Sequence, residues 1–117
     1  MKVLIAEDDP VSSYVLAARI RKMGHEVLVT ENGLASTDDT RRVEYFRRAL
    51  RCVADCLQED IDVRGYFCWS ALDNFEWNSG YRPKFGIIAV NRETQQRTPK
   101  PSAAWLGGGR GCWQAGS

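Results

Sequence analysis

The chain has 117 residues, of which 44% are hydrophobic, and its 16 basic and 15 acidic residues leave a net charge of +1. Such a chain can bury one hydrophobic core, and its balanced charge gives no electrostatic reason to expect nucleic acid or a membrane surface as a partner. No apolar run approaches the roughly 20 residues of a membrane helix, and the N-terminal segment becomes acidic too early for a secretory signal. We therefore expect one compact cytoplasmic domain.

The first predicted elements are a strand and a helix. Residues 2–7 (KVLIAE) form a short apolar run, which is typical of a buried strand. Asp9 is a suitable N-cap and Pro10 suits a first helical turn, so a helix is predicted over residues 10–23. Gly24 is the natural C-terminal stop of this helix.

A second strand is predicted over residues 26–30, within HEVLVT, and Asn32-Gly33 after it is typical of a turn. The first strand, the helix and this second strand follow one another, and only a short connection separates the helix from the second strand. Together they predict a parallel, right-handed βαβ unit.

A second helix is predicted over residues 39–58, where Asp38 or Asp39 supplies the N-cap. Its apolar residues recur at helical spacing and predict a buried face. They are Val43, Phe46, Leu50, Val53 and Leu57. The other face carries arginines, which we expect to lie in water. They are Arg41, Arg42, Arg47, Arg48 and Arg51.

The remaining elements complete an α/β fold. A third strand is predicted over residues 64–69, within VRGYFCWS, and a short extra strand, FGIIAV, follows a polar and aromatic loop. The stretch TPKPSAAWL predicts the start of a helix, whereas the glycine-rich residues 107–117 predict a frayed, disordered tail. The expected architecture is a parallel βαβαβ unit with a short extra strand.

The cysteines carry no metal or redox signal. They are Cys52, Cys56, Cys68 and Cys112. No pair has the CxxC spacing of a zinc or redox site, and His25 is the only histidine. We expect reduced thiols.

Residues 1–33 resemble the start of a response-regulator receiver domain, a flavodoxin-like fold, through KVLIAEDDP, RKMGHEV and VTENG. In that family an acidic pair after the first strand holds Mg²⁺. The resemblance implies a weak Mg²⁺ site at Glu7 and Asp8, with Asp9 beside them, and hard cations do prefer such oxygen ligands. A receiver also needs a phosphate-accepting aspartate at the end of its third strand, and VRGYFCWS contains no acid.

Residues 28–106 resemble the C-terminal end of family 1 glycoside hydrolases, the β-glucosidase group, which has a TIM-barrel fold. The likeness runs from VTENG through GYFCWSALDNFEW to TPKPSAAW, and it implies that Glu31 is the catalytic nucleophile. It also implies that Trp69 stacks under the sugar as an aromatic plate and that Phe85 lines the pocket. Glu76 and Trp77 would form hydrogen bonds with the sugar hydroxyls. A tryptophan at a strand end is also commonly a core residue.

The same family needs an acid/base carboxyl group, which lies in an N-E-P motif on its fourth barrel strand. This sequence contains no such motif. Retaining glycosidases use two carboxyl groups roughly 5–5.5 Å apart, and loss of the acid alone costs roughly 10²–10⁴-fold in rate. The resemblance therefore implies a truncated, β-glucosidase-like segment that has no catalytic activity by itself and requires no cofactor.

The two resemblances overlap at Thr30–Gly33, which predicts a chimera joined there. Both parents are built from parallel βα units. Because the second helix and the third strand resemble the barrel parent, we expect the strand order 1-2-3. The acids that end the first strand, Glu7 to Asp9, would then share an edge with Glu31 and either bind a cation or raise a carboxyl pKa. Alternatively, Asp9 caps the first helix and the other acids point into water.

Three functions stay open. They are an inert structural chimera, a weak carbohydrate-binding or vestigial glycosidase module for β-glucosides, and a receiver-like Mg²⁺-binding signalling fragment. A three-stranded sheet also leaves unpaired backbone groups on both outer strands, and the loop over residues 71–85 presents aromatic side chains. We therefore expect a homo-oligomer in which two copies pair edge to edge.

Overall fold

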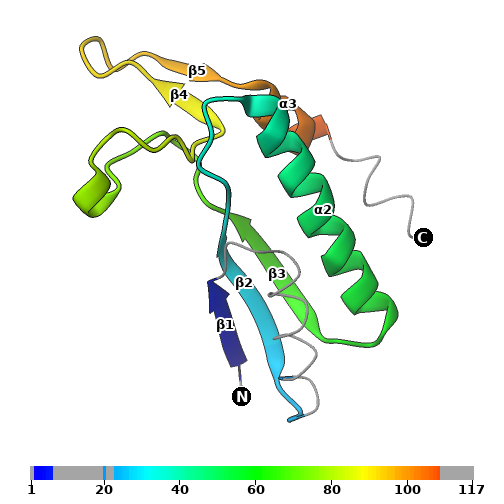
Figure 1. The fold of residues 1–117 in the computed structure, drawn as a ribbon. Coiled ribbons are helices and arrows are strands. Elements are labelled where there is room, and N and C mark those ends of the chain that lie inside the picture. The colour runs from blue at the N-terminus through cyan, green and yellow to red at the C-terminus, as the bar shows by residue number, and fades with distance from the viewer. Residues whose placement is uncertain (1, 7–19, 21–22, 109–117) are drawn as a thin grey trace. The chain divides into compact units, whose positions relative to one another are not determined.

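The structure is a computed structural model that describes residues 2–6, 20 and 23–108 (Figure 1). The chain divides into two compact units. The first, called the sheet unit, comprises residues 1–33 and 45–69. The second, called the loop unit, comprises residues 34–44 and 70–117.

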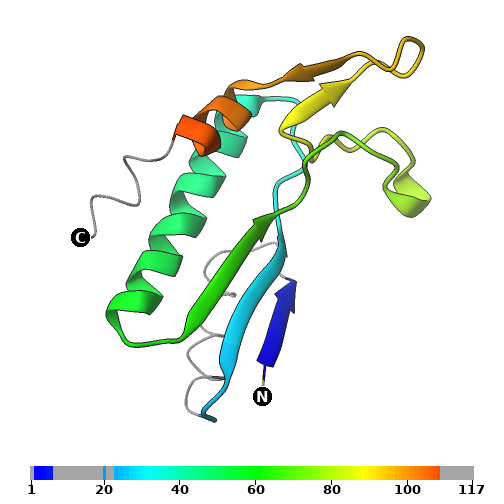
Figure 2. The ribbon, with the colours of Figure 1, turned by 180° about the vertical axis from the view of Figure 1, so that it is seen from behind.

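The sheet unit is built on a three-stranded parallel sheet with the order β1-β2-β3 (Figures 1 and 2). Strand β1 spans Lys2–Ala6, β2 spans Glu26–Asn32 and β3 spans Val63–Cys68. The three predicted strands and the predicted order are confirmed. In this order each strand pairs with the next one along the chain, as consecutive strands of a barrel do.

Strand β2 is longer than predicted. Asn32 belongs to it and pairs with Cys68 of β3, so the predicted turn at Asn32-Gly33 is wrong. The carbonyl of Asn32 accepts a hydrogen bond from the Trp69 backbone N–H at 2.8 Å. The ladder to β3 therefore outweighs the local turn preference of Asn-Gly, which is a weak signal when a strand partner is present.

Helix α2 spans Asp39–Gln58, as predicted. Asp38 caps it, because its Oδ1 accepts hydrogen bonds from the Thr40 backbone N–H, at 3.0 Å, and from the Thr40 hydroxyl. These hydrogen bonds lower the pKa of Asp38. The charged carboxylate thus lies at the end of the helix where the macrodipole is positive.

The buried face of α2 lies about one residue N-terminal to the predicted one. Arg42 and Phe46 are 0% exposed, and Ala49 and Cys56 are also buried, whereas Leu57 is 45% exposed. The prediction that Arg42 lies in water is wrong, as is the burial of Leu57. The sequence pattern missed this because two of the partners of the Arg42 guanidinium are backbone carbonyls, which no residue type in the sequence indicates.

The sheet unit has a small apolar core between α2 and the strands. Figures 1 and 2 show α2 running alongside β3. Cys56 of α2 packs with Val27 of β2, Ile20 and Ile61, and Val63 packs against this cluster. Among the described residues, Cys52, Cys56 and Cys68 form no disulfide.

Cys56 makes the stability of this core sensitive to alkaline pH. Burial raises the pKa of its thiol from 9.0 to about 11. Between these values the thiol ionises in the unfolded chain but stays protonated in the folded one. The stabilising contribution of the neutral thiol is therefore complete below pH 9 and is lost as the pH rises to about 11.

We expect Cys56→Ala to flatten the fall in the free energy of unfolding across this pH range. Urea unfolding followed by circular dichroism, at intervals from about pH 8 to about pH 11, measures the slope. Ile61→Val is the matched control, since it alters the same cluster without removing a titrating group. An equal slope in Cys56→Ala and the wild type would contradict the assignment.

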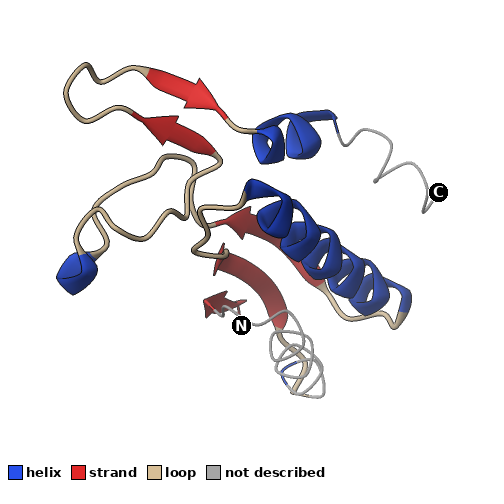
Figure 3. Ribbon diagram, turned by 45° about the horizontal axis from the view of Figure 1, so that its top comes forward, coloured by secondary structure: helices blue, strands red, loops and turns tan. Residues whose placement is uncertain are grey.

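The loop unit contains the remaining elements (Figure 3). The 3₁₀ turn η1 spans Trp77–Ser79, and β4 (Ile88–Val90) pairs antiparallel with β5 (Arg97–Pro99). Helix α3 spans Pro101–Gly108. Strand β4 lies within the predicted FGIIAV strand, whereas β5 was not predicted because it is short and ends in proline.

The prediction of a disordered tail over residues 107–117 is wrong at its first two residues. Gly107 and Gly108 belong to α3 rather than to a disordered tail. Glycine is tolerated in a last helical turn, where it also commonly ends helices. Residues 109–117 of the predicted tail lie outside the described residues.

Most of the predicted helix over residues 10–23 also lies outside the described residues. Ile20 is helical and buried, whereas Met23 is 70% exposed in the turn that follows. Gly24 has φ +77°, a conformation that few other residues adopt and that suits the predicted stop.

The outer strands of the sheet, β1 and β3, each pair with β2 alone in the part of the chain that the structure describes. The expected edge-to-edge homo-oligomer stays a prediction. Among the helices that can be described, none combines the length and the apolar character needed to cross a membrane.

Candidate functional site

A β-bulge in β2 determines where Glu31 points. Ile5 of β1 pairs with Val29 of β2. The next residue of β1, Ala6, pairs with Glu31, so β2 carries one extra residue at this point. The register with β3 also shifts between Val29 and Asn32. The alternation of burial slips at the same place: Val29 and Asn32 are buried and Glu31 is exposed. Bulges re-aim side chains in this way, and here one leaves Glu31 exposed at the carboxyl end of β2.

The neighbour of Glu31, Asn32, is held by two tyrosines. Its side chain is 1% exposed. Its Nδ2 donates to the Tyr45 hydroxyl of α2 at 3.0 Å, and its Oδ1 accepts from the Tyr66 hydroxyl of β3 at 2.7 Å. Burial raises the pKa of Tyr66, so its hydroxyl remains a donor at neutral pH. We call Asn32, Tyr45 and Tyr66 the asparagine clamp.

Trp69 follows β3 directly and lies against Gly33. The Trp69 backbone N–H donates to the Asn32 carbonyl at 2.8 Å. A Cβ atom at position 33 would lie 1.7 Å from the carbonyl oxygen of Trp69, so only glycine permits this approach. Glu31 and Trp69 are therefore brought to the carboxyl ends of neighbouring strands, as the resemblance to a barrel implied.

In the loop unit, Glu76 and Trp77 lie in a tight turn. The Glu76 backbone N–H donates to Gly80 O at 2.7 Å, and the Gly80 N–H donates to Trp77 O at 3.0 Å. Trp77 has φ 44° and is 83% exposed. A positive φ is rare for a bulky residue and is concentrated at functional sites. The turn thus holds the indole ring out in water.

Further aromatic side chains lie in the same loop. Phe75 and Tyr81 are exposed and stack edge to face, with ring centroids 5.3 Å apart. The Arg92 guanidinium lies 4.2 Å from the centre of the Tyr81 ring, which is a cation–π contact. Phe85 is half-buried, and its carbonyl accepts the Ser70 N–H at 3.2 Å.

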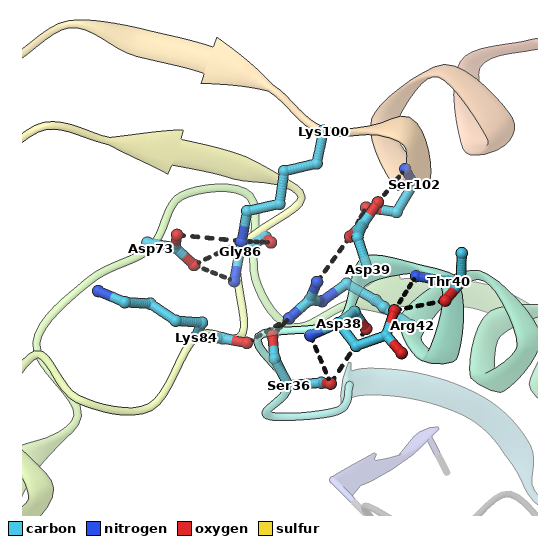
Figure 4. A network of polar contacts seen from close by, with 10 residues as sticks. All are labelled: Ser36, Asp38, Asp39, Thr40, Arg42, Asp73, Lys84, Gly86, Lys100 and Ser102. Carbon is cyan, nitrogen blue, oxygen red and sulfur yellow. Dashed lines mark hydrogen bonds and ion pairs between the residues drawn. The ribbon is translucent and has the colours of Figure 1, made fainter.

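A buried ion pair closes the base of this loop (Figure 4). Asp73 is 5% exposed, and its carboxylate lies 3.0 Å from Lys100 Nζ and accepts the Gly86 N–H at 2.9 Å. Lys100 Nζ also donates to Gly86 O at 2.7 Å, and Arg92 donates to the Asp73 carbonyl. The buried carboxylate is thus both paired and hydrogen-bonded, as burial of a charge requires.

Arg42 organises a second buried network in the loop unit (Figure 4). Its Nη1 lies 2.6 Å from Asp39 Oδ1, and its Nη2 donates to the carbonyls of Ser36 and Lys84. Asp39 also accepts the Ser102 backbone N–H at 2.7 Å and its hydroxyl at 2.8 Å. Burial alone would raise the pKa of Asp39, but the hydrogen bonds from Ser102 and Arg42 outweigh it and lower the pKa.

The structure places the predicted site residues in two groups. Glu31 and Trp69 lie in the sheet unit, and the others lie in or at the end of one loop of the loop unit. Those others are Glu76, Trp77 and Phe85. Their roles toward a sugar stay predictions. The predicted metal ligands Glu7, Asp8 and Asp9 lie outside the described residues, and within those residues no three His, Cys, Asp or Glu side chains gather to hold a metal ion.

The sequence did not reveal the asparagine clamp or the Asp73–Lys100 pair. Tyr45 and Tyr66 are 13 and 34 residues from Asn32, and neither position carries a local signal. The one available hint was that a polar residue followed an apolar strand, and Asn-Gly made a turn the simpler interpretation.

Comparisons with known proteins give a consistent result. The sequence pattern of glycosyl hydrolase family 1 matches residues 8–108. A 6-phospho-beta-galactosidase of Staphylococcus aureus is 40% identical over 91 residues, which cover 69% of this chain and 19% of that protein. The family match over residues 8–108 includes most of residues 1–33, the segment that resembles a receiver. The resemblance to a receiver stays a prediction.

Solved structures agree with the fold. Beta-glycosidase BGL167 is 57% identical with a TM-score of 0.81, over 85% of this chain and 24% of that one. A beta-glycosidase from Pyrococcus horikoshii is 34% identical with a TM-score of 0.82, over 93% of this chain and 28% of that one. The chain therefore spans between about a fifth and just over a quarter of the length of these proteins.

Proposed function

The chain belongs to glycosyl hydrolase family 1, and from this premise we propose that it forms the nucleophile-bearing part of a retaining β-glycosidase site, with Glu31 as the nucleophile. The position of Glu31 carries the proposal. Its exposed carboxylate is aimed by a bulge at the carboxyl end of a parallel strand, next to the strand that leads to Trp69. Barrel enzymes place their catalytic groups at this end of their strands.

By itself the chain supplies half of the required chemistry. Retaining hydrolysis needs a nucleophile and an acid that protonates the leaving oxygen. Glu31 is the first of these groups, and the family's N-E-P motif, which carries the second, is absent from the sequence. Glu31 can therefore attack the anomeric carbon only where the leaving group departs without a proton.

The proposed substrate is a β-glucoside without a phosphate group. The relatives include both a 6-phospho-beta-galactosidase and beta-glucosidases. By resemblance, Glu76 contacts the sugar hydroxyls. A phosphate monoester carries about −1.5 to −2 charge at pH 7, and two like charges about 4 Å apart repel by about 4 kcal/mol at an effective dielectric constant near 20. The Glu76 carboxylate thus favours a neutral sugar.

A receiver-like origin for residues 1–33 is a second candidate, supported by KVLIAEDDP. Such a segment would bind Mg²⁺ through Glu7 and Asp8. It would not transfer phosphate, because the third strand has no aspartate. The glycosidase proposal holds with either origin, since both parents supply a parallel βαβ unit.

We expect no hydrolysis of an alkyl β-glucoside, whose alkoxide cannot leave without a proton, above the background of Glu31→Gln. A 2-deoxy-2-fluoro-β-glucoside with a dinitrophenolate leaving group bypasses the missing acid. Glu31 attacks its anomeric carbon, the carbon–oxygen bond to dinitrophenolate breaks, and the fluorine slows release of the glycosyl ester. Mass spectrometry should find one fluoroglucosyl group on Glu31.

The exposed Glu44 supplies the control, since Glu44→Gln should be labelled like the wild type. Labelling that persists in Glu31→Gln, or a wild-type chain that takes up no label, would overturn the proposed function.

A further inference from the structure

We propose that Asn32 is a positioning residue that holds the bulge of β2 and thereby aims Glu31, an inference that rests on the proposed function. Asn32 does not reach the exposed side of the strand, because its side chain is 1% exposed. It acts on Glu31 through the peptide bond that joins them.

The asparagine clamp connects the site to a helix and to the neighbouring strand. Tyr45 comes from α2 and Tyr66 from β3, and both hydroxyls reach the Asn32 amide within 3.0 Å. The Tyr66 hydroxyl donates to Oδ1, whereas Nδ2 donates to the Tyr45 hydroxyl. A side chain must offer both a donor and an acceptor, without charge, to make these contacts in a buried place. Asparagine meets this requirement and leucine of similar size does not.

The clamp lies where the strand is irregular. The extra residue of β2 falls between Val29 and Asn32, and a bulge leaves part of the ladder unpaired. The backbone there is therefore less constrained by strand pairing than elsewhere. The fixed amide of Asn32 supplies the missing constraint on the side opposite to Glu31.

Asn32 also contacts Trp69, the predicted aromatic plate under the sugar. The Asn32 carbonyl accepts the Trp69 N–H at 2.8 Å. Only a movement of the Asn32 backbone would disturb both this hydrogen bond and the clamp. Asn32 thus couples the orientation of the Glu31 side chain to the position of the Trp69 backbone.

The test uses Asn32→Leu in the full chain, with two measurements. The first is the rate at which the dinitrophenyl fluoroglucoside labels Glu31. The second is the carboxyl ¹³C signal of Glu31 in glutamate-labelled chain, assigned by its loss in Glu31→Gln. We expect Asn32→Leu to slow labelling roughly 10²-fold, as small misplacements of a reacting group do, and to move the Glu31 signal. Ile61→Val, a change in the core cluster away from the clamp, should leave both unchanged.

The outcomes separate this inference from the proposed function. An unmoved Glu31 signal, or labelling of Asn32→Leu at the wild-type rate, overturns the positioning role while the nucleophile role stands. A wild-type chain that is not labelled, but whose Glu31 signal moves in Asn32→Leu, overturns the proposed function and supports the positioning role. If Asn32→Leu does not fold by circular dichroism, the double variant Tyr45→Phe with Tyr66→Phe removes only the hydroxyls. It should reproduce the slow labelling and the moved signal, and wild-type behaviour would overturn the inference.

Discussion

Gly33→Ala is expected to lower the free energy of unfolding by roughly 4 kcal/mol or more, the range of severe backbone and packing defects. The added Cβ would lie 1.7 Å from the Trp69 carbonyl oxygen and 2.8 Å from its carbonyl carbon. These atoms are backbone and cannot rotate away as a side chain could. Relief requires the ends of β2 and β3 to separate, which breaks the hydrogen bond from the Trp69 N–H to the Asn32 carbonyl.

Urea unfolding followed by circular dichroism measures this effect. Gly107→Ala is the matched control, because a Cβ at that helical position meets nothing within 4 Å. The control should be neutral or stabilise the chain by up to about 1 kcal/mol, since alanine favours helix more than glycine does. A Gly33→Ala chain as stable as the wild type would show that the two strand ends do not pack as described.

Arg42→Met is expected to destabilise the chain by roughly 3–5 kcal/mol, the usual cost of removing one partner of a buried ion pair. Methionine fills part of the space but offers no donor. Asp39 loses its guanidinium partner, and the carbonyls of Ser36 and Lys84 lose a donor. Each acceptor loses one hydrogen bond, which adds to the cost. However, Asp39 keeps the hydrogen bonds from Ser102, and the Lys84 carbonyl keeps that from the Ser36 N–H.

The neighbouring Arg41 provides the control for this experiment, since it has the same charge and lies exposed on the same helix. Arg41→Met should change the unfolding free energy by no more than about 0.5 kcal/mol, as surface substitutions usually do. Equal effects of the two substitutions in a urea titration would contradict the buried network.

The elements that the sequence predicted well are those with strong local patterns. The apolar runs of β1, β2 and β3 and the capped, periodic helix α2 lie where expected. Their order was predicted from the resemblance of the second helix and the third strand to a barrel, in which successive strands lie side by side. The resemblance to a family, rather than any pattern, pointed to Glu31.

The parts that the sequence did not predict depend on partners far along the chain. Arg42 is buried because the carbonyl of Lys84, 42 residues away, accepts its hydrogen bond. Asn32 is part of a strand because Cys68 pairs with it and two distant tyrosines bind its amide. A carbonyl has no residue type, and the two tyrosines lie 13 and 34 residues from Asn32, so no local pattern of residues indicated either burial.

The closed base of the loop between Asp73 and Gly86 has an evolutionary consequence. Because the Asp73 carboxylate holds the Gly86 N–H at 2.9 Å and Lys100 binds both residues, the two ends of the loop are fixed independently of what lies between them. Lengthening a closed loop costs little, about 0.6 kcal/mol for each doubling of its length. Insertions, deletions and substitutions between Asp73 and Lys84, whose carbonyl binds Arg42, can therefore accumulate without shifting the frame beneath them. In such an arrangement one segment can diverge in sequence and length, and the rest of the domain is inherited unchanged.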